Sequence, residues 1–221
     1  MMKIKPQVIG LMGRAGSGKD AAAQVLMQEH KFVRVAFGDG VKQEVADSFC
    51  IPRSLLTIRE TKEQKTPALA ICQSLNASFI DRMITLNECI YSPRSPREIM
   101  QFWGTEYRRL DDKHYWVQRT KHEIQDLIQD GQTKIVVSDV RFDNEAALIE
   151  SKFNGRIWFI SRPIVDSMPV LHISEDIGIF LQRRPLIVDN SGSLKLLHSA
   201  VTNAYQDQSQ IDTDVDENLG T

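Results

Sequence analysis

The sequence is poor in cysteine and contains no long apolar run. Its three cysteines, Cys50, Cys72 and Cys89, are odd in number and form no CxxC pair, which favours free thiols in a reducing compartment over a disulfide framework. No stretch is long and apolar enough to span a bilayer, and the N-terminal "MMKIKPQVIGLMG" lacks the core of a signal peptide. We therefore expect a cytoplasmic protein without a membrane partner.

The sequence also lacks an excess of either charge. Its 27 basic and 29 acidic side chains give a formal net charge of -2. Such a balance provides no general attraction to nucleic acid, so we expect no direct nucleic-acid partner. The five histidines and three cysteines form no zinc-binding constellation. The 221 residues, 42% of them hydrophobic, suffice for one substantial core with a small appended subdomain.

Short apolar runs typical of β-strands alternate with longer helical patterns. The runs are "QVIGLM", "FVRVAF", "KIVVSD", "RIWFIS" and "PLIVD". Near-continuous apolar runs suit strands buried on both faces, and their alternation with helices predicts βαβ units. We therefore predict an α/β fold of three layers, with a parallel sheet between two layers of helices.

The alternation stops between Ile51 and Gly131, where helical patterns dominate. "SPRE", Ser95–Glu98, combines a capping serine, a proline at the first helical position and a glutamate three residues after the cap, so a helix is expected to begin there. The tail "QDQSQIDTDVDENLGT" is polar, acidic and short of core formers, which predicts disorder. We therefore expect a core formed by residues 1–50 and 132–205. The helical insertion is expected over 51–131 and the disordered tail over 206–221.

A glycine-rich stretch, "GRAGSGKD", follows the first apolar run. Gly13, Gly18 and Lys19 match GxxxxGK between a predicted strand and a predicted helix, the context in which this motif binds phosphate. Inward backbone N–H groups and the helix dipole attract phosphate, and the lysine reaches the β- and γ-phosphates. The alternative, a glycine-rich turn with a solvated lysine, is disfavoured by this context. The predicted ATP-binding residues of the loop are Gly13, Arg14, Ala15, Gly16, Ser17, Gly18, Lys19 and Asp20.

The loop ends in Asp20, where serine or threonine is usual. A hydroxyl at this position holds Mg²⁺, and a carboxylate can replace it directly or through water because Mg²⁺ prefers oxygen ligands. An acidic residue in the first turn of a helix is also explained by the helix dipole. The sequence leaves both interpretations open.

Two further stretches are candidates for binding the phosphate acceptor. "FGDGVK" follows a strand, at the sheet edge where α/β proteins bind ligands. Asp39 is interpreted as a contact to a sugar or base, and Lys42 as a contact to a phosphate. The alternative is that Asp39 caps the next helix and Lys42 is a surface lysine. "QFWGTEYRR" places polar groups beside Trp103, which suits a base and a monophosphate, or else an amphipathic helix with Trp103 in the core. The polar residues expected to share a face of this helix, at its three- or four-residue spacing, are Gln101, Thr105, Arg108 and Arg109.

The strand "KIVVSD" ends in Asp139, which resembles a Walker-B carboxylate beside Mg²⁺. Arg141 lies just beyond the strand, where it can neutralise charge on a transferring group. Asn144 and Glu145 are interpreted as pocket residues or as the start of the next helix. Asp139 is also interpreted as orienting the partners of the acceptor phosphate. A strand-end cap and a surface arginine are the remaining alternative for Asp139 and Arg141.

The stretch "FISRP" places Arg162 between a strand and an irregular segment that contains "LHISED", which we interpret as a lid. An arginine supplied by a lid stabilises charge on a transferring phosphoryl group, and Arg183 and Arg184 are alternatives for this role. Asn190 lies in a turn between the last strand and the last helix, where we expect an adenine.

Together these stretches resemble the bacteriophage-type deoxynucleoside monophosphate kinases, a family of P-loop nucleotide kinases. "GRAGSGKD", "FGDGVK", "QFWGTEYRR", "HYW", "SDVRFDNEA" and "NSGSL" carry the resemblance, which covers most of Gly10–Leu196. It implies a five-stranded parallel core of P-loop NTPase type, a helical acceptor-binding insertion and a lid. It also implies ATP-dependent conversion of deoxynucleoside 5′-monophosphates to diphosphates, in the host cytoplasm if the chain is viral.

The sequence departs from the pattern of this family at two places. Ala21 stands where threonine is common, which leaves Ser17 as a candidate for the hydroxyl that positions Mg²⁺. Gly40 and Val41 replace an expected Pro–Leu pair before Lys42, which is a milder departure.

The resulting hypothesis assigns a role to each candidate residue. Loop amides and Lys19 hold the ATP phosphates, and Mg²⁺ bridges the β- and γ-oxygens with Asp20 and Asp139 as candidate ligands. Trp103 or Trp116 forms a wall for the base, and Arg108 is the alternative to Arg109. The residues expected in catalysis are Lys19, Arg109, Arg141, Asp139 and Arg162. Those expected to bind the acceptor are Asp39, Lys42, Gln101, Trp103, Thr105, Glu106, Arg108, Arg109, Trp116, Asn144 and Glu145.

Two other functions are compatible with the motifs. One is a different small-molecule kinase, of the phosphomevalonate or dephospho-coenzyme A kinase type, because those also use a phosphate loop and a strand that ends in aspartate. The other is a nucleotide-binding regulatory or nucleic-acid-associated module, which the balanced charge disfavours. The sequence does not decide between a monomer and a homodimer.

Overall fold

The computed structural model describes residues 6–58, 60–167, 181 and 184–218, and the chain divides into two compact units. The sheet unit consists of Met1–Ala36 and Glu123–Thr221, and the helical unit of Phe37–His122. The insertion expected over 51–131 overlaps the helical unit, which begins earlier and ends earlier. The helix that follows the second strand therefore belongs to the helical unit.

The sheet unit is built on five parallel strands, as the alternation of apolar runs predicts. Their order in the sheet is β2-β3-β1-β4-β5, and every neighbouring pair is parallel. The central strand is apolar and almost wholly buried, which confirms the expectation of strands covered on both faces. The strands are β1 (Gln7–Met12), β2 (Val33–Val35), β3 (Lys134–Val140), β4 (Arg156–Ser161) and β5 (Leu186–Asp189).

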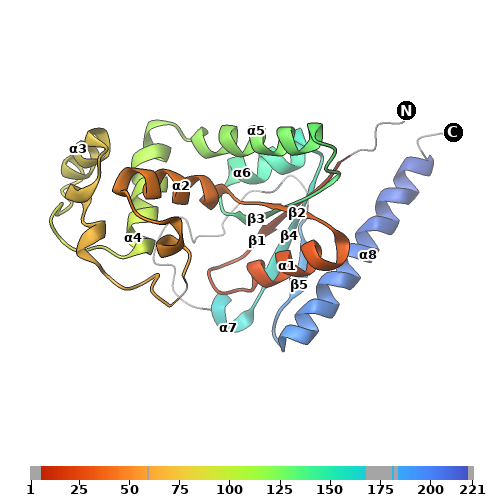
Figure 1. The fold of residues 1–221 in the computed structure, drawn as a ribbon. Helices are drawn as coiled ribbons and strands as arrows, with labels where there is room; N and C mark the ends of the chain where they lie inside the picture. Colours follow the sequence, from red (N-terminus) through yellow and green to blue (C-terminus); the bar gives the residue numbers. More distant parts are fainter. Residues whose placement is uncertain (1–5, 59, 168–180, 182–183, 219–221) are drawn as a thin grey trace. The chain divides into compact units, whose positions relative to one another are not determined.

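Helices cover both faces of this sheet (Figure 1). On one face α1 (Lys19–His30) and α8 (Leu194–Asn218) pack on side chains such as Ile9 and Leu11 of β1. On the other face α6 (Asp143–Ala147) leads into a π-helical turn, η5 (Leu148–Lys152). Gly10 of β1 faces η5, and a Cβ there would lie 2.5 Å from Ile149 Cδ1, so a larger residue would force this side chain to move.

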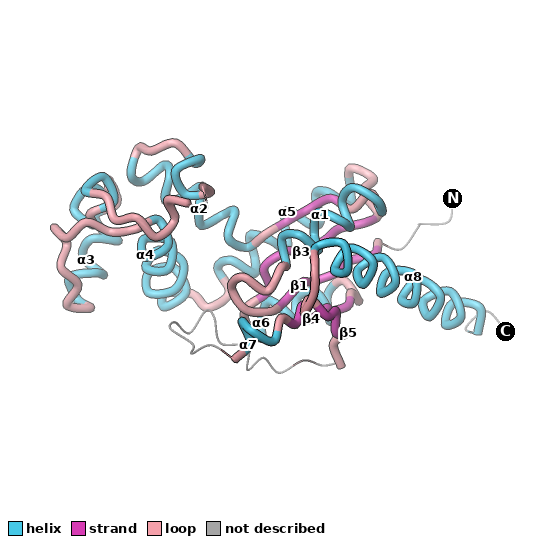
Figure 2. Tube along the Cα trace, turned by 90° about the horizontal axis from the view of Figure 1, so that it is seen from below, coloured by secondary structure: helices cyan, strands magenta, loops and turns pink. Residues whose placement is uncertain are grey.

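The tail expected to be disordered is instead largely helical. Helix α8 continues without a break to Asn218, through most of the tail expected over 206–221, and Figure 2 shows it continuing past the strands. Gln208, in this continuation, is buried, and its Oε1 accepts a hydrogen bond of 2.7 Å from Nε1 of Trp158 on β4. The prediction of disorder is wrong here because a docked helix has already passed its costly nucleation step, so polar residues can extend it.

The helical unit begins with α2 (Phe37–Phe49) and ends with the first half of α5 (Tyr115–Gln129), whose second half belongs to the sheet unit. Three short 3₁₀ segments and three helical segments lie between them. The predicted helix start is confirmed, since Ser95 Oγ accepts from Glu98 N at 3.2 Å and Glu98 Oε2 accepts from Ser95 N at 2.8 Å. The segments are η1 (Arg53–Leu56), η2 (Pro67–Leu69), η3 (Ile71–Gln73), α3 (Ala77–Thr85), α4 (Pro96–Gln101) and a π-helix, η4 (Phe102–Arg109).

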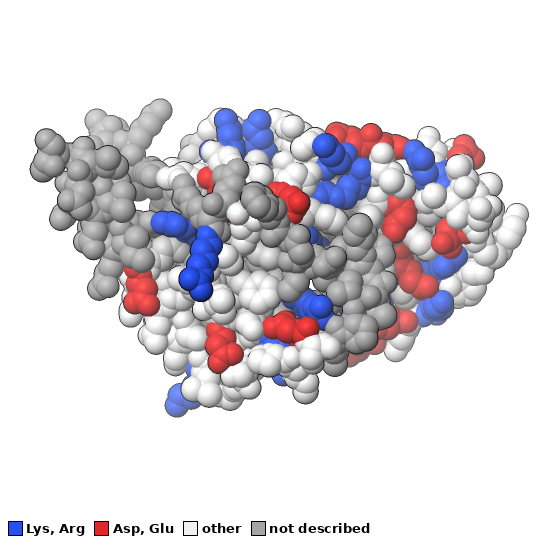
Figure 3. Space-filling view, turned by 180° about the vertical axis from the view of Figure 1, so that it is seen from behind, with Lys and Arg blue, Asp and Glu red and all other residues white. Residues whose placement is uncertain are grey.

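Charges of both signs are interspersed on the surface. Figure 3 shows lysine and arginine side chains close to acidic ones over one face of the described residues. No helix among the described residues is long and apolar enough to cross a membrane. No group of three or more histidine, cysteine or acidic side chains within the same residues is arranged to hold a metal ion.

The contact between α8 and β4 predicts the effect of a substitution in the tail. Gln208→Ala leaves the buried indole N–H of Trp158 without its acceptor, so we expect the free energy of unfolding to fall by about 1–3 kcal/mol. Urea denaturation followed by circular dichroism measures this change. Gln206→Ala, at an exposed position on the same helix, should change stability by less than about 0.5 kcal/mol. Equal effects of the two substitutions would contradict the docking of the tail.

Candidate functional site

The glycine-rich loop leaves β1 and enters α1 along a left-handed backbone path. Gly13, Gly16 and Gly18 have φ angles of 139°, 81° and 103°. A Cβ at Gly13 would lie 2.6 Å from the carbonyl oxygen of Ile160, and a Cβ at Gly18 would collide with the side-chain nitrogen of Asn190. Glycine is therefore needed at both ends of the loop. Such a path, followed by a helix N-terminus, is the arrangement that gathers backbone N–H groups around an anion.

Lys19 folds back over the loop. Its ammonium nitrogen donates to the carbonyl oxygens of Gly13 at 2.7 Å and Arg14 at 2.8 Å. The positive charge is thereby held against the loop. Asp20, the next residue, is exposed in the first turn of α1. Ser17, in contrast, is fully buried, and its Oγ has no hydrogen-bond partner among the described residues.

Asn190, near whose backbone an adenine is predicted, supports the loop with its side chain. Its side chain is 6% exposed, and Nδ2 donates a 2.7 Å hydrogen bond to the carbonyl oxygen of Ser17. The side-chain amide thus supports the loop backbone, and the adenine expected on the backbone of this turn stays a prediction. The sequence indicates that Asn190 lies near the loop, because both follow parallel strands and such strands end at the same edge of the sheet.

The end of β4 contributes a second support. Arg162 Nη1 donates to the carbonyl oxygen of Gly16 at 3.2 Å, so this guanidinium lies against the loop. Its backbone N–H and the hydroxyl of Ser161 donate to Asp166 Oδ2, at 3.0 and 2.9 Å, which fixes the turn into α7 (Pro163–Asp166). Arg184 is exposed, whereas Arg183 and the segment "LHISED" lie outside the described residues.

The end of β3 lies beside the start of the loop because β3 pairs with β1. Gly10 pairs with Val137 but Met12 pairs with Val140, so β3 has one extra residue at this point. Asp139 belongs to this bulge, and bulges re-aim side chains beside functional sites. Arg141 follows directly, so the predicted residues Asp139 and Arg141 both lie at the edge of the sheet that carries the loop.

Glu145 caps a helix. It is 3% exposed, and its Oε2 accepts from the backbone N–H groups of Arg141 at 2.8 Å and Phe142 at 3.2 Å. This is the second of the two interpretations that the sequence left open, the start of the next helix. Asn144, its neighbour on α6, is half-buried.

In the helical unit, the predicted residues Asp39 and Lys42 lie together. Lys42 Nζ is 2.8 Å from Asp39 Oδ1, and Nη2 of Arg53 is 3.2 Å from the same oxygen. Sequence reasoning missed Arg53 because it lies on a separate 3₁₀ segment. The two cations and one carboxylate leave this group with one positive charge in excess.

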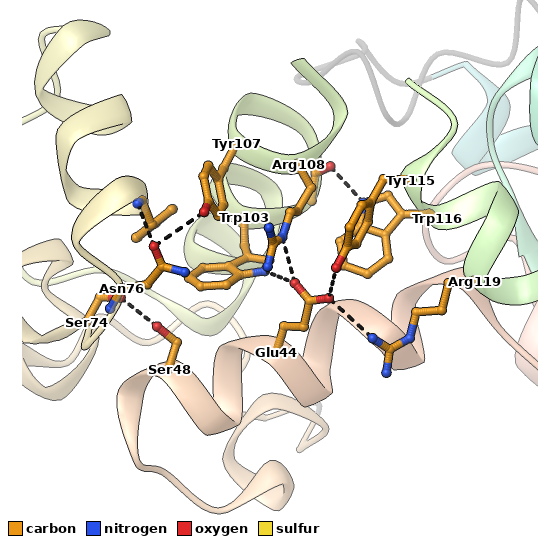
Figure 4. Close-up of polar contacts among 12 residues, drawn as sticks. Glu44, Ser48, Ser74, Asn76, Trp103, Tyr107, Arg108, Tyr115, Trp116 and Arg119 are labelled. Atoms are coloured by element: carbon orange, nitrogen blue, oxygen red, sulfur yellow. Dashed lines mark hydrogen bonds and ion pairs between the residues drawn. The ribbon is translucent and has the colours of Figure 1, made fainter. Parts of the chain in front are cut away.

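Glu44 on α2, which sequence reasoning also missed, is the centre of the polar contacts drawn in Figure 4. Its Oε2 accepts from Trp103 Nε1 at 2.9 Å and Arg108 Nε at 2.8 Å. Its Oε1 accepts from the Tyr115 hydroxyl at 2.6 Å and Arg119 Nη1 at 3.2 Å. A carboxylate with 13% of its side chain exposed therefore has four donors. No signal in the sequence marks it, because its partners are 59 to 75 residues away.

Two tryptophans predicted to face the base are instead core residues. Trp103 is 1% exposed and Trp116 is 4% exposed. The indole N–H of Trp116 donates to the carbonyl oxygen of Gly104 at 2.9 Å, and that of Trp103 is held by Glu44. Both rings are fully partnered inside the helical unit, which corrects the prediction that either forms a wall for the base.

Arg108 and Arg109, at the end of "QFWGTEYRR", have different partners. The segment is π-helical, with i to i+5 hydrogen bonds. Arg108 turns to Glu44, whereas Arg109 Nη1 donates to the carbonyl oxygen of Lys113 at 3.3 Å. The other predicted residues of this segment, Gln101, Thr105 and Glu106, are half-buried.

The environment of Glu44 shifts the pKa of two neighbouring groups. Burial, followed by the hydrogen bond and charge of Glu44, raises the pKa of the Tyr115 hydroxyl above its ordinary value. Burial alone lowers the pKa of Arg108, but the hydrogen bond and charge of Glu44 outweigh it, and the net shift is upward. Both groups keep their protons and remain donors to the carboxylate.

The sheet topology and the braced glycine-rich loop define an α/β protein of the P-loop class. A profile of the family described as "Deoxynucleotide monophosphate kinase" matches residues 50–201, more than half of the chain. The chain belongs to the deoxynucleotide monophosphate kinase family. This membership supports a nucleotide kinase role.

Two proteins illustrate the similarity. One, from Acanthamoeba polyphaga mimivirus, bears the name "Putative deoxynucleotide monophosphate kinase" and is 28% identical over 214 residues, which is 92% of this chain and 98% of the relative. The other is the solved structure of dephospho-CoA kinase from Campylobacter jejuni, with 11% identity and a TM-score of 0.46 over 93% of this chain and 98% of that one.

The raised pKa of Tyr115 predicts a late step in an ultraviolet titration of the tyrosines. Because the pKa of Tyr115 is higher in the folded than in the unfolded state, its protonated hydroxyl contributes to the free energy of unfolding. This contribution is complete at pH values below the unfolded pKa, about 10, and is lost as the pH rises through the higher folded pKa. Tyr115→Phe should remove the last step of the titration. Tyr91→Phe, at a highly exposed position, should leave that step in place. A last step that survives Tyr115→Phe would contradict the assignment.

Proposed function

We propose that this chain transfers the γ-phosphoryl group of ATP to the 5′-phosphate of deoxynucleoside monophosphates. The observation that carries the proposal is the glycine-rich loop, with Lys19 folded over it and two other strands supporting it, in a chain of this family. In the reaction an oxygen of the acceptor phosphate attacks the γ-phosphorus. The bond from that phosphorus to the oxygen of the β-phosphate breaks, and ADP and a deoxynucleoside diphosphate are released.

The residues of the sheet unit act on the donor. The loop N–H groups and the ammonium of Lys19 bind the β- and γ-phosphates and neutralise charge that accumulates during transfer. Arg162, which already lies 3.2 Å from a loop carbonyl oxygen, and Arg141 at the end of β3 add positive charge at the same edge of the sheet. Such catalysis requires positioning and electrostatic stabilisation, and no covalent intermediate with the protein.

The side chains at this edge also fit a magnesium ion. Mg²⁺ keeps several waters and takes one or two carboxylates together with substrate phosphates, so it does not need a cluster of protein ligands. Asp20 and Asp139 are the candidate carboxylates, and the buried Ser17 Oγ, which lacks a partner among the described residues, is an orphaned oxygen in the loop. When bound, the ion neutralises charge on the β- and γ-phosphates.

The residues of the helical unit bind the acceptor in this proposal. Asp39 and Lys42 are joined by an ion pair, and the excess positive charge that Arg53 adds favours an anionic ligand. Gln101, Thr105, Glu106 and Arg109 remain candidates for contacts to the sugar, base and phosphate. The core of this unit, which includes Trp103 and Trp116, holds these side chains in place.

An acceptor panel tests the reaction. The purified chain is incubated with ATP and Mg²⁺ and each natural deoxynucleoside or ribonucleoside monophosphate, together with mevalonate phosphate and dephospho-coenzyme A, and ADP release is measured with a coupled assay. We expect turnover with one or more deoxynucleoside monophosphates. Turnover confined to mevalonate phosphate or dephospho-coenzyme A would replace the proposed acceptor, and ATP binding without transfer to any acceptor would exclude a kinase.

Substitution of the loop lysine tests the assignment of the donor site. Lys19→Ala removes the charge held against the loop, so we expect kcat to fall by about 100-fold or more while the circular dichroism spectrum is unchanged. Lys195→Ala, at an exposed position on α8, is the matched control and should retain full turnover. Full turnover by Lys19→Ala would show that the loop is wrongly assigned.

A further inference from the structure

The guanidinium of Arg108 is held in one orientation by its surroundings in the helical unit. Its Nε donates to Glu44 Oε2 at 2.8 Å, and its central carbon lies 4.8 Å from the ring centroids of both Tyr107 and Tyr115 (Figure 4). Trp103 contributes a third ring, at 5.7 Å. Cation–π contact with several rings and a charge-assisted hydrogen bond together restrict a side chain that is otherwise flexible.

The hydrogen-bonding capacity of Arg108 is only partly used by these contacts. Of its five N–H groups, the one on Nε is used by Glu44, and Nη1 and Nη2 have no hydrogen-bond partner among the described residues. The aromatic rings provide no strong acceptor. The Arg108 side chain is 27% exposed, so the rings and Glu44 enclose it only in part. Nη1 and Nη2 form a planar fork that matches two oxygens of a phosphate.

The charges around Glu44 also favour an additional anion. One carboxylate faces two guanidinium groups, Arg108 and Arg119, so the cluster has one positive charge in excess. A single cation would be enough to pair with the charge of Glu44, and the second one is in excess. Arg109, in contrast, already uses one terminal nitrogen on the carbonyl oxygen of Lys113.

We propose that Arg108 binds the phosphate of the acceptor, and that Glu44 is a positioning residue that fixes the Arg108 guanidinium for this contact. This inference rests on the proposed function, since the phosphate is that of a deoxynucleoside monophosphate. Glu44 touches no substrate and acts through the hydrogen bond to Nε. The contact is bidentate and made through the two terminal nitrogens.

Arg108→Lys tests the phosphate contact, because it keeps the charge and removes the fork. We expect the KM of the acceptor to rise by roughly tenfold or more, with the KM of ATP unchanged. Tryptophan fluorescence measures binding of a deoxynucleoside monophosphate and of the matching deoxynucleoside, and only the monophosphate should bind more weakly. Arg82→Lys is the control, because it makes the same change at an arginine of this unit that pairs with Asp111, and both affinities should match those of the unaltered chain.

Glu44→Gln tests the positioning role, because it keeps the shape of the side chain and removes its charge. We expect the acceptor KM to rise by about three- to tenfold with little change in kcat, a split that a general loss of structure would not produce. If Glu44→Gln does not fold, as judged by circular dichroism, Tyr115→Phe replaces it, since it removes one hydrogen bond to Glu44 and keeps the ring beside Arg108. Its expected effect is smaller, about two- to fivefold, in the same direction.

The outcomes separate this inference from the function on which it rests. An unaltered acceptor KM and affinity in Arg108→Lys, or equal weakening of nucleoside and monophosphate, would overturn the phosphate contact. An acceptor KM unchanged in a folded Glu44→Gln, or in Tyr115→Phe where that variant replaces it, would overturn the positioning role alone. If the unaltered chain phosphorylates no deoxynucleoside monophosphate, the proposed function fails, and the difference in binding between monophosphate and nucleoside still decides whether Arg108 binds phosphate.

Discussion

The backbone path from β1 into α1 is the constraint on which the sheet unit depends. Three residues of the loop have positive φ angles, a conformation that costs about 1–3 kcal/mol for most other residues. The path is also confined from outside, by Ile160 against Gly13 and by Asn190 against Gly18. Because these neighbours come from the ends of β4 and β5, the loop has its shape only when the parallel sheet is assembled around β1.

A partly buried carboxylate plays the corresponding part in the helical unit. Glu44 joins α2 to the π-helix and to α5 through four hydrogen bonds, two of them from cations. The desolvation of such a group is costly, and an apolar side chain of similar size would pack the same space without that cost. The retained charge has one evident effect in the structure, which is to fix where Arg108 and Arg119 lie.

The sequence predicts the features that local pattern determines. The apolar runs, the GxxxxGK spacing and the capping box at Ser95 each depend on residues close together in the chain, and the structure contains all five strands and the cap as expected. The role of Asn190 was only half predictable, because its position after β5 places it near the loop, whereas its hydrogen bond to Ser17 depends on how the sheet is assembled.

Other features could not be predicted because they depend on contacts between distant residues. The partners of Glu44 follow it by 59 to 75 residues, and no periodicity connects them. The sequence left Arg108 and Arg109 as alternatives for one role, and their different partners depend on tertiary contacts of the π-helical segment Phe102–Arg109. The acidic tail has the composition of a disordered segment, yet the docking of Gln208 on β4 continues the helix.

The two units differ in what their proposed anion-binding features require of the sequence. The loop presents backbone N–H groups, so its shape depends on glycines at Gly13 and Gly18 and tolerates variation at exposed positions such as Ala15. The helical unit presents side chains, so its chemistry depends on the identity of Glu44 and the residues it holds. A change of substrate is therefore easier to achieve by substitution in the helical unit, where one side chain can change the ligand without disturbing a backbone path. In the loop the same change first has to preserve a conformation that only glycine adopts without strain.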